Sequence, residues 1–192
     1  MRTEMSQISV SHDHTRATTY EVLSAAVAYP DERTFHHFPT VDTHRGELVA
    51  EYDTLFRNRA IWLFSTEYTA KGQFQKTQQL ADISGFYRAF GVQIEKERPD
   101  ALSAELEFMY FLIFKSIYAA ERNIEDGGEK KALCDDAQAK FFETHLYPAA
   151  CAMCAQVGTA SEVFFYTEIF EELMSFMDQE NHFFSGLKQV SQ

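Results

Sequence analysis

The chain has 192 residues, a length that usually makes one domain. Acidic residues number 29 and basic residues 17, giving a formal net charge of −12. This charge argues against a nucleic-acid partner, because phosphate contacts need clustered Lys and Arg. Glycine and proline number only 8 and 4, which argues against a many-turned β-sandwich. With 45% hydrophobic residues, the chain has enough apolar side chains for a sizeable core.

The beginning of the chain is polar, and no apolar run of signal-peptide length occurs within residues 1–19. No stretch approaches the roughly 18 consecutive apolar residues that a membrane-spanning helix needs. The three cysteines are an odd number and do not indicate a disulfide framework. We therefore expect a cytoplasmic protein with no membrane insertion, and residues 1–15 are expected to form a flexible polar segment.

Helical periodicity dominates every long segment of the chain. In chain order, helices are expected over residues 16–29, 46–68 (one long helix or two joined ones), 76–90, 101–121, 129–146, 148–158 and 161–180. The helix over 101–121 is apolar nearly all round, which predicts a place in the middle of a bundle. The pattern indicates an all-α, single-domain bundle of about seven helices over residues 16–181, followed by a short tail over 182–192.

Residues that start and stop helices support several of these boundaries. Gly91 is a plausible position for the left-handed residue that ends a helix, and Pro148 suits the start of one. Asp100 is predicted to be the N-cap of the helix over 101–121. Thr159 and Glu162 have the spacing of a capping box at the start of the last helix.

Cys151 and Cys154 are the most suggestive residues for chemistry, because a Cys-x-x-Cys pair can form a redox couple or half of a zinc site. A second such pair is absent, and the neighbouring residues are small and apolar. Packing in a helix is therefore the preferred interpretation, and a helical metal-binding or thiol-redox protein is the alternative. A helical scaffold without a specific partner is a third interpretation.

Other patterns for catalysis or cofactor binding are missing. The chain contains no phosphate-binding glycine motif, no Gly-x-Ser-x-Gly and no Glu-x-x-His pair of a di-iron bundle. The paired histidines near residues 12–14 and 36–37 are interpreted as surface side chains. We expect no catalytic residue, no metal and no cofactor.

Glu105 and Glu107 lie in the most apolar predicted helix, on roughly opposite sides of it. A buried charge is costly unless it is paired. The preferred expectation is that one carboxylate reaches solvent while the other pairs with an arginine such as Arg88 or Arg98. A carboxylate lining a groove for a cationic peptide is the alternative.

Four segments together resemble the TorD, DmsD and NarJ family of redox-enzyme maturation chaperones. These are TYEVLSAAVAYP (19–30), LADISGFYRAFG (80–91), PDALSAELEFM (99–109) and HLYP (145–148). The segment over 80–91 is most similar to the branch that serves type II enzymes of the dimethyl-sulfoxide-reductase family. The family usually has a histidine after the aspartate of the third segment, where this chain has Ala101.

The resemblance implies an all-helical, system-specific chaperone of a molybdenum oxidoreductase. Such a protein binds the apo catalytic subunit and its twin-arginine signal peptide, and holds it until the molybdenum cofactor is inserted before export or assembly. The resemblance leaves open whether the chain is a monomer or a homodimer. An acidic chain without a catalytic constellation agrees with this interpretation, because a twin-arginine peptide offers positive charge followed by an apolar run.

The peptide site is predicted at the bend formed by Pro99 and Asp100, since Pro99 disfavours helix in the residue before it. Such a corner can present a carboxylate to a partner. The predicted partner-binding residues are Tyr20, Phe86, Tyr87, Pro99, Asp100 and Glu105.

Overall fold

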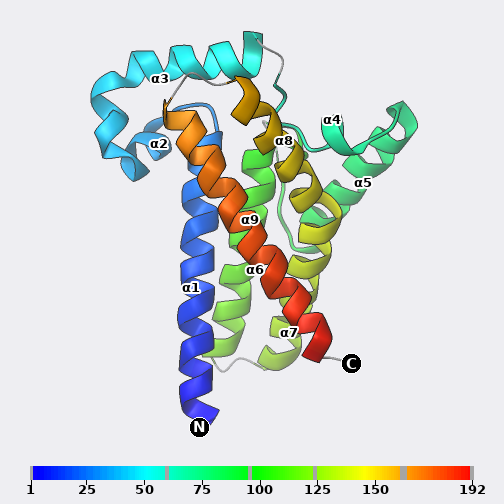
Figure 1. Ribbon diagram of the computed structural model, residues 1–192. Coiled ribbons are helices and arrows are strands. Elements are labelled where there is room, and N and C mark those ends of the chain that lie inside the picture. The colour runs from blue at the N-terminus through cyan, green and yellow to red at the C-terminus, as the bar shows by residue number, and fades with distance from the viewer. Residues whose placement is uncertain (1, 59–60, 95–96, 123–124, 161–163, 191–192) are drawn as a thin grey trace.

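The computed structural model describes residues 2–58, 61–94, 97–122, 125–160 and 164–190 (Figure 1). Its α-helices are α1 (Arg2–Val27), α2 (Glu32–His37), α3 (Arg45–Tyr52), α4 (Thr66–Thr69), α5 (Gln73–Ala89), α6 (Leu102–Glu121), α7 (Gly127–Phe141), α8 (Tyr147–Ala160) and α9 (Phe164–Val190). A 3₁₀ helix, η1 (Pro39–His44), and two π-helical stretches, η2 (Asp53–Asn58) and η3 (Phe142–Leu146), join some of them. No strand occurs in these ranges, so the predicted all-α fold is confirmed.

The long helices α1 and α6 lie side by side, and α9 crosses in front of them (Figure 1). Helix α6 also packs against α7, while α8 packs against α9. The central position predicted for α6 from its apolar composition is therefore confirmed. Helices α4 and α5 project from one side of this bundle.

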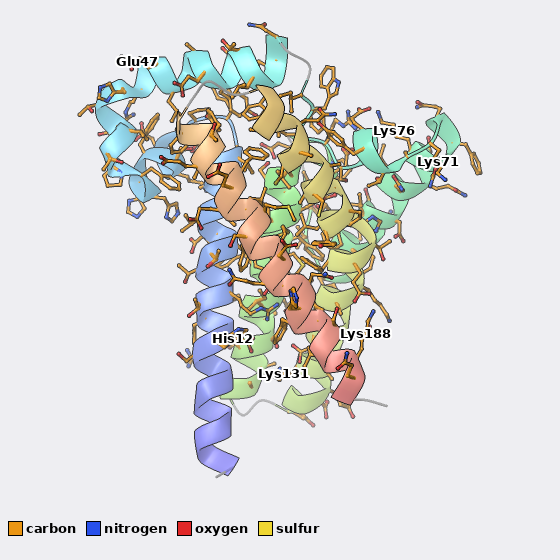
Figure 2. The ribbon with its side chains drawn as sticks, viewed as in Figure 1. His12, Glu47, Lys71, Lys76, Lys131 and Lys188 are labelled. Atoms are coloured by element: carbon orange, nitrogen blue, oxygen red, sulfur yellow. The ribbon has the colours of Figure 1, made fainter. Side chains whose placement is uncertain are left out.

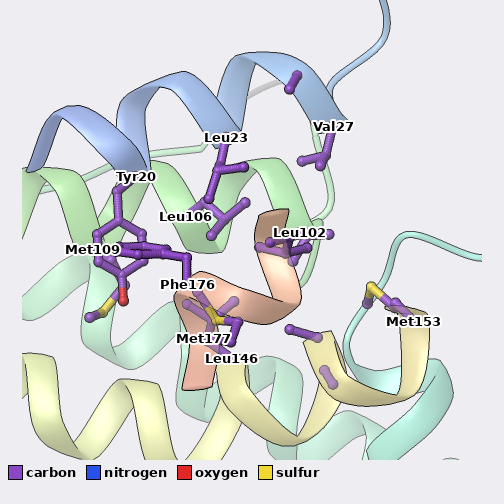
Figure 3. Close-up of a cluster of buried hydrophobic side chains, with 14 of the residues drawn as sticks. Tyr20, Leu23, Val27, Leu102, Leu106, Met109, Leu146, Met153, Phe176 and Met177 are labelled. Carbon is purple, nitrogen blue, oxygen red and sulfur yellow. The ribbon is translucent and has the colours of Figure 1, made fainter. Parts of the chain in front are cut away.

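The core is shared by helices that are far apart in the sequence. Figure 3 shows buried side chains from α1, α6, η3, α8 and α9 in one cluster, including Tyr20, Leu23, Leu102, Leu106, Met109, Leu146, Met153, Phe176 and Met177. Burying one large aliphatic side chain contributes about 1.5–3 kcal/mol. The C-terminal helix is thus part of the same hydrophobic core as the first one.

A buried ion pair also joins α1 to α9. The guanidinium of Arg16 donates to both carboxylate oxygens of Glu180, at 2.6 Å from Nε and 2.7 Å from Nη2. The hydroxyl of Tyr20 donates to the same carboxylate at 2.9 Å. Because both charges are buried, this two-point contact is what compensates their loss of hydration.

Helices α1 and α9 are longer than the sequence pattern predicted. Residues 2–15, expected as a flexible segment, belong to α1, because no Gly or Pro interrupts the chain before Pro30. Helix α9 continues to Val190 and not only to residue 180. Phe184, in the expected tail, is buried and its ring lies 5.0 Å from that of Phe142.

The helix, or two joined helices, predicted over 46–68 is wrong at residues 61–65, whereas 66–68 belong to α4. Residues 61–64 are not helical, and their backbone instead meets the segment that precedes α6. Gly91 has a φ of 77° and follows α5, as predicted for a residue that ends a helix. Pro148 lies in the first turn of α8, also as predicted. The predicted capping box extends into residues 161–163, which lie outside the described ranges.

Candidate functional site

The connection between α5 and α6 is held by backbone contacts to a distant segment. Leu102 donates its amide to the carbonyl of Leu63 at 2.9 Å, and Ser65 donates its amide to the carbonyl of Asp100 at 2.8 Å. Phe64 and Ala101 form an isolated antiparallel bridge. We call residues 63–66 and 98–102 the hinge clasp. It fixes the start of α6 against a segment that lies almost forty residues earlier.

Asp100 is buried inside the hinge clasp and does not cap α6. The N-cap of α6 is Ala101, which has no capping side chain. The Asp100 carboxylate instead accepts hydrogen bonds from the hydroxyl of Thr66 and from the guanidinium of Arg98, whose Nη2 lies 2.8 Å away. The predicted N-cap is therefore wrong, because the carboxylate turns toward a nearby cation and hydroxyl.

Glu105 is fully buried one turn into α6. Its Oε1 accepts a hydrogen bond of 2.6 Å from the hydroxyl of Ser65, and its Oε2 has no hydrogen-bond partner. Burial raises the pKa of this carboxyl well above its ordinary value. Its hydrogen-bond partner is Ser65 and not the expected arginine. A protonated carboxyl costs less free energy at this buried position than a carboxylate would.

Glu107 points away from the core on the exposed side of α6. Its carboxylate lies 3.6 Å from the guanidinium of Arg33, and both side chains are about half exposed. The expectation that one of the two glutamates reaches solvent is confirmed, although its cation is Arg33 and not Arg88 or Arg98. Glu107 is thus an acidic group available at the surface beside the hinge clasp.

A groove lies next to the hinge clasp, between α6 and the segment that follows α5. It has a volume of about 590 Å³ and is lined by Tyr87, Val92, Gln93, Ile94, Glu97, Ala104, Glu107, Phe108, Tyr110 and Phe111. Its walls are chiefly aliphatic and aromatic, and the charged residues that line it within the described ranges, Glu97 and Glu107, are acidic and exposed. The groove can therefore accommodate an apolar chain that carries positive charge.

The structure brings four of the six predicted site residues together. Tyr87 lines the groove and donates a hydrogen bond of 2.7 Å from its hydroxyl to the carbonyl of Pro99. Asp100 lies in the hinge clasp, and Glu105 contacts the clasp through Ser65; both side chains are buried. These residues can position the groove walls, and their part in binding a partner stays a prediction.

Tyr20 and Phe86 lie elsewhere. Tyr20 is buried against α9, where its ring meets Phe176 at 4.8 Å. Phe86 is partly buried, and its ring packs against Phe141 and His145, at 5.3 and 5.9 Å. Neither residue lines the groove.

Several groove residues were not identified from the sequence. Glu97, Val92 and Ile94 lie between the glycine that ends α5 and Pro99, in a segment without helical periodicity. The sequence signal that could have identified this wall of the groove is the pair Val92 and Ile94, two positions apart between Gly91 and Pro99. Tyr110 and Phe111 belong to the second apolar face of α6. Because this helix is apolar nearly all round, its sequence pattern does not distinguish this face from the one that packs in the core.

Charged side chains of α4 and α5 form ion pairs that reach the hinge clasp. Lys76 of α5, labelled in Figure 2, pairs with Glu67 of α4, and Glu67 also lies 3.1 Å from the guanidinium of Arg98. Alternating charges therefore run from Lys76 through Glu67 and Arg98 to the buried Asp100. This network ties α4 and α5 to the start of α6.

The cysteine pair is not placed with other metal-binding side chains. Burial is the main cause that raises the pKa of the Cys154 thiol to about 12, and it also raises the pKa of Cys151. His145 is buried and its Nε2 lies 2.8 Å from the Asp82 carboxylate. Within the described ranges, no three side chains of His, Cys, Asp or Glu are grouped as metal ligands.

None of the helices in the described ranges is long and apolar enough to cross a bilayer.

Comparison with known proteins gives two similarities. The model of the family described as nitrate reductase delta subunit matches residues 21–155, which include the hinge clasp and the groove. A protein of Dechloromonas aromatica (strain RCB), the perchlorate reductase assembly chaperone protein, is 29% identical to this chain over 102 residues. That match covers 52% of this chain and 43% of the relative, so it spans less than half of the relative's length.

Proposed function

We propose that this chain, which belongs to the nitrate reductase delta subunit family, is a cytoplasmic assembly chaperone for the catalytic subunit of a molybdenum oxidoreductase. The match covers most of the chain and confirms the family that the four sequence segments indicated. In this proposal the chain binds the apo subunit through its twin-arginine signal peptide. It holds the subunit while the molybdenum cofactor is inserted, and releases it for export or assembly. The chain itself has a binding role and no catalytic one.

The groove beside the hinge clasp is the observation that carries this proposal. A twin-arginine peptide offers two guanidinium groups followed by an apolar run, and the groove offers Glu97 and Glu107 beside aromatic and aliphatic walls. Opposite charges steer association and set the register, while burial of apolar surface supplies affinity. The overall charge of −12 acts in the same direction on a cationic peptide.

The hinge clasp supports the groove by fixing its walls before a peptide arrives. Tyr87 and Pro99 are joined by a hydrogen bond, and the residues on either side of Pro99, Arg98 and Asp100, contact each other. A preformed groove costs less conformational entropy on binding than a mobile one. Buried polar contacts at the hinge are thus assigned to positioning, while the exposed acids contact the peptide.

The experiment is deletion of the gene in its host, followed by measurement of molybdenum content and activity in each molybdenum oxidoreductase. We expect one such enzyme to accumulate without cofactor, and the wild-type gene to restore it. A variant with Glu97→Gln and Glu107→Gln should restore it poorly. The matched control, Glu129→Gln with Glu168→Gln, removes two exposed charges that do not line the groove and should restore it fully. Full cofactor content in every molybdenum enzyme of the deletion strain would refute the proposed function.

A further inference from the structure

A row of aromatic rings, half-buried at Tyr110 and exposed beyond it, continues from the groove along α6. Tyr110, Phe114 and Tyr118 are spaced by four residues, which places them on one side of the helix. Phe114 is 52% exposed and Tyr118 is 48% exposed. We call these three residues the α6 stripe. Large aromatic side chains exposed in a row on one helix commonly mark a binding surface.

The α6 stripe and the groove form one continuous surface. Tyr110 lines the groove, and its ring centroid lies 6.3 Å from that of Phe114 in the stripe. Phe111, one residue further, also lines the groove and stacks with the buried Phe108 at 6.5 Å. An apolar ligand seated in the groove therefore meets further aromatic surface in the direction of the C-terminal end of α6.

The two ends of this surface carry different charges. At the groove end, Glu21 and Glu107 lie near Tyr110, and their negative charges help burial to raise its pKa. Further along, the ammonium of Lys115 lies 4.9 Å from the Phe111 ring centroid, and Arg122 lies 5.6 Å from that of Tyr118.

One acidic residue at the far end of α6, Glu121, lies against α1. Its carboxylate lies 3.5 Å from His14 of α1, and both side chains are about half exposed. The cations beside the rings of this surface are Lys115, at the half-buried Phe111, and Arg122, at the exposed Tyr118. At the groove end Glu97 is exposed, and Glu107 lies beside the half-exposed Arg33.

We propose that the α6 stripe binds the apolar run of the client's signal peptide as a helix parallel to α6, with the peptide's arginines at Glu97 and Glu107. The inference rests on the proposed function and adds the location and direction of the bound peptide. Parallel alignment places the positive end of the peptide helix dipole at the acidic end and the negative end near Lys115 and Arg122.

The dimensions of the stripe fit this ligand. From Glu107 to Tyr118, α6 advances by about 11 residues, or roughly 16 Å at 1.5 Å per residue. Apolar runs of signal peptides have about 7–15 residues, so a run of about 11 residues or more in helical form spans this length. An amphipathic or apolar helix lying against aromatic anchors four residues apart is a known mode of peptide recognition.

The existing partner of Glu107 does not prevent this binding. Arg33 lies 3.6 Å from Glu107, and both side chains are about half exposed. Ion pairs of this kind contribute little stability, because solvent screens them. An arginine of the peptide can therefore take the place of Arg33.

The test uses the full chain and two synthetic peptides labelled with a fluorophore. The first has two arginines followed by about 12 apolar residues, and the second has the same residues in reverse order. Phe114→Ser and Tyr118→Ser, both at exposed positions, are compared with Phe74→Ser, whose ring on α5 is 77% exposed. We expect roughly tenfold weaker binding of the first peptide to each stripe variant and unchanged binding to the control.

Crosslinking reports the direction of the peptide. A photoreactive amino acid placed at position 118 should capture the C-terminal half of the first peptide, and one placed at position 103 should capture its arginine end. Capture in the opposite order would overturn the parallel alignment. Circular dichroism of every variant establishes that the fold is retained.

The remaining outcomes separate this inference from the proposed function. If the stripe variants bind the peptide like the wild type while Glu97→Gln with Glu107→Gln weakens it, the stripe assignment is wrong and the proposed function stands. If the stripe variants only change the mass of the protein in solution, the stripe is a contact between two copies of the chain, which also overturns the inference. If the wild type binds neither peptide, the inference and signal-peptide binding both fail.

Discussion

Arg98 and Asp100 are two residues apart, and the guanidinium of Arg98 contacts both carboxylate oxygens of Asp100, at 2.9 Å from Nε and 2.8 Å from Nη2. Asp100 has no exposed surface, whereas the Arg98 side chain is 37% exposed. The carboxylate therefore compensates its burial within the chain, using a cation that stays partly in water. This contact makes the bend before α6 a closed polar junction.

Asp100→Asn should lower the free energy of unfolding by about 2 kcal/mol, because it removes a charge-assisted hydrogen bond inside a buried network. The sequence pattern, which treats Asp100 as a helix cap, predicts almost no cost. Urea denaturation distinguishes the two. Glu67→Gln is the matched control, since it removes an exposed partner of the same Arg98 and should cost less than about 1 kcal/mol. Equal costs for both variants would contradict the buried-junction account.

Glu105→Gln should flatten the pH dependence of stability. Burial raises the pKa of Glu105, so the folded state keeps this proton at pH values where the unfolded chain has lost it. Wild-type stability therefore falls as pH rises above the ordinary glutamate pKa of about 4.3. Glutamine imitates the protonated acid and removes this contribution.

The measurement for Glu105 is urea denaturation at several values between about pH 5 and about pH 8. Wild-type stability should decline with pH more steeply than that of Glu105→Gln. Glu107→Gln, two residues away and exposed, should follow the wild-type slope. Parallel curves for wild type and Glu105→Gln would show that Glu105 is ionised in the folded protein.

The sequence was sufficient for the features that local chemistry decides. The apolar composition of α6 predicted its central place, and Gly91 predicted the end of α5. The partners of Asp100 and Glu105 were not predictable in the same way, because Thr66 and Ser65 lie 34 and 40 residues earlier. Only the folded backbone brings these positions together.

The ends of α1 and α9 were underestimated for a related reason. The outer turns of α9 carry Phe183, Phe184 and Leu187 at helical spacing, but the contacts that hold the two helices together, the buried Arg16–Glu180 pair and Phe184, join opposite ends of the chain. A groove lies beside the bend at which the peptide site was predicted, and the binding of a peptide there stays a prediction. The exposed acids of the groove, such as Glu97, were not singled out, because a charged residue in a connecting segment carries no periodic signal.

Tyr20→Phe and Tyr87→Phe should have similar effects on stability and different effects on binding. Each removes one hydroxyl hydrogen bond, from Tyr20 to Glu180 at 2.9 Å and from Tyr87 to the carbonyl of Pro99 at 2.7 Å. Each should therefore cost about 1–2 kcal/mol of unfolding free energy. Only Tyr87→Phe should weaken binding of a twin-arginine peptide, because Tyr87 lines the groove and Tyr20 packs against α9. Weaker binding of the peptide to Tyr20→Phe would show that Tyr20 takes part in peptide binding, as predicted from the sequence.

Cys151→Ser combined with Cys154→Ser should leave client maturation intact. Burial raises the pKa of both thiols, to about 12 for Cys154, so little thiolate forms at neutral pH. Stability should fall by about 1 kcal/mol, since a hydroxyl replaces a thiol in a partly apolar site. Molybdenum incorporation into the client measures the outcome. Loss of incorporation in a normally folded double variant would establish a functional role for the thiols.

Peptide association should slow as salt concentration rises, because exposed carboxylates at the groove steer a cationic ligand over distances that salt screens. The screening length falls to about 10 Å at 0.1 M ionic strength, so the effect should be largest below that concentration. Stopped-flow fluorescence with the twin-arginine peptide measures the association rate at each salt concentration. In Glu97→Gln with Glu107→Gln the dependence should be weaker, whereas Glu129→Gln with Glu168→Gln removes the same net charge elsewhere and should keep most of it. Two double variants with the same salt dependence would mean that the net charge of the protein steers the peptide, and that the acids of the groove have no separate part in its capture.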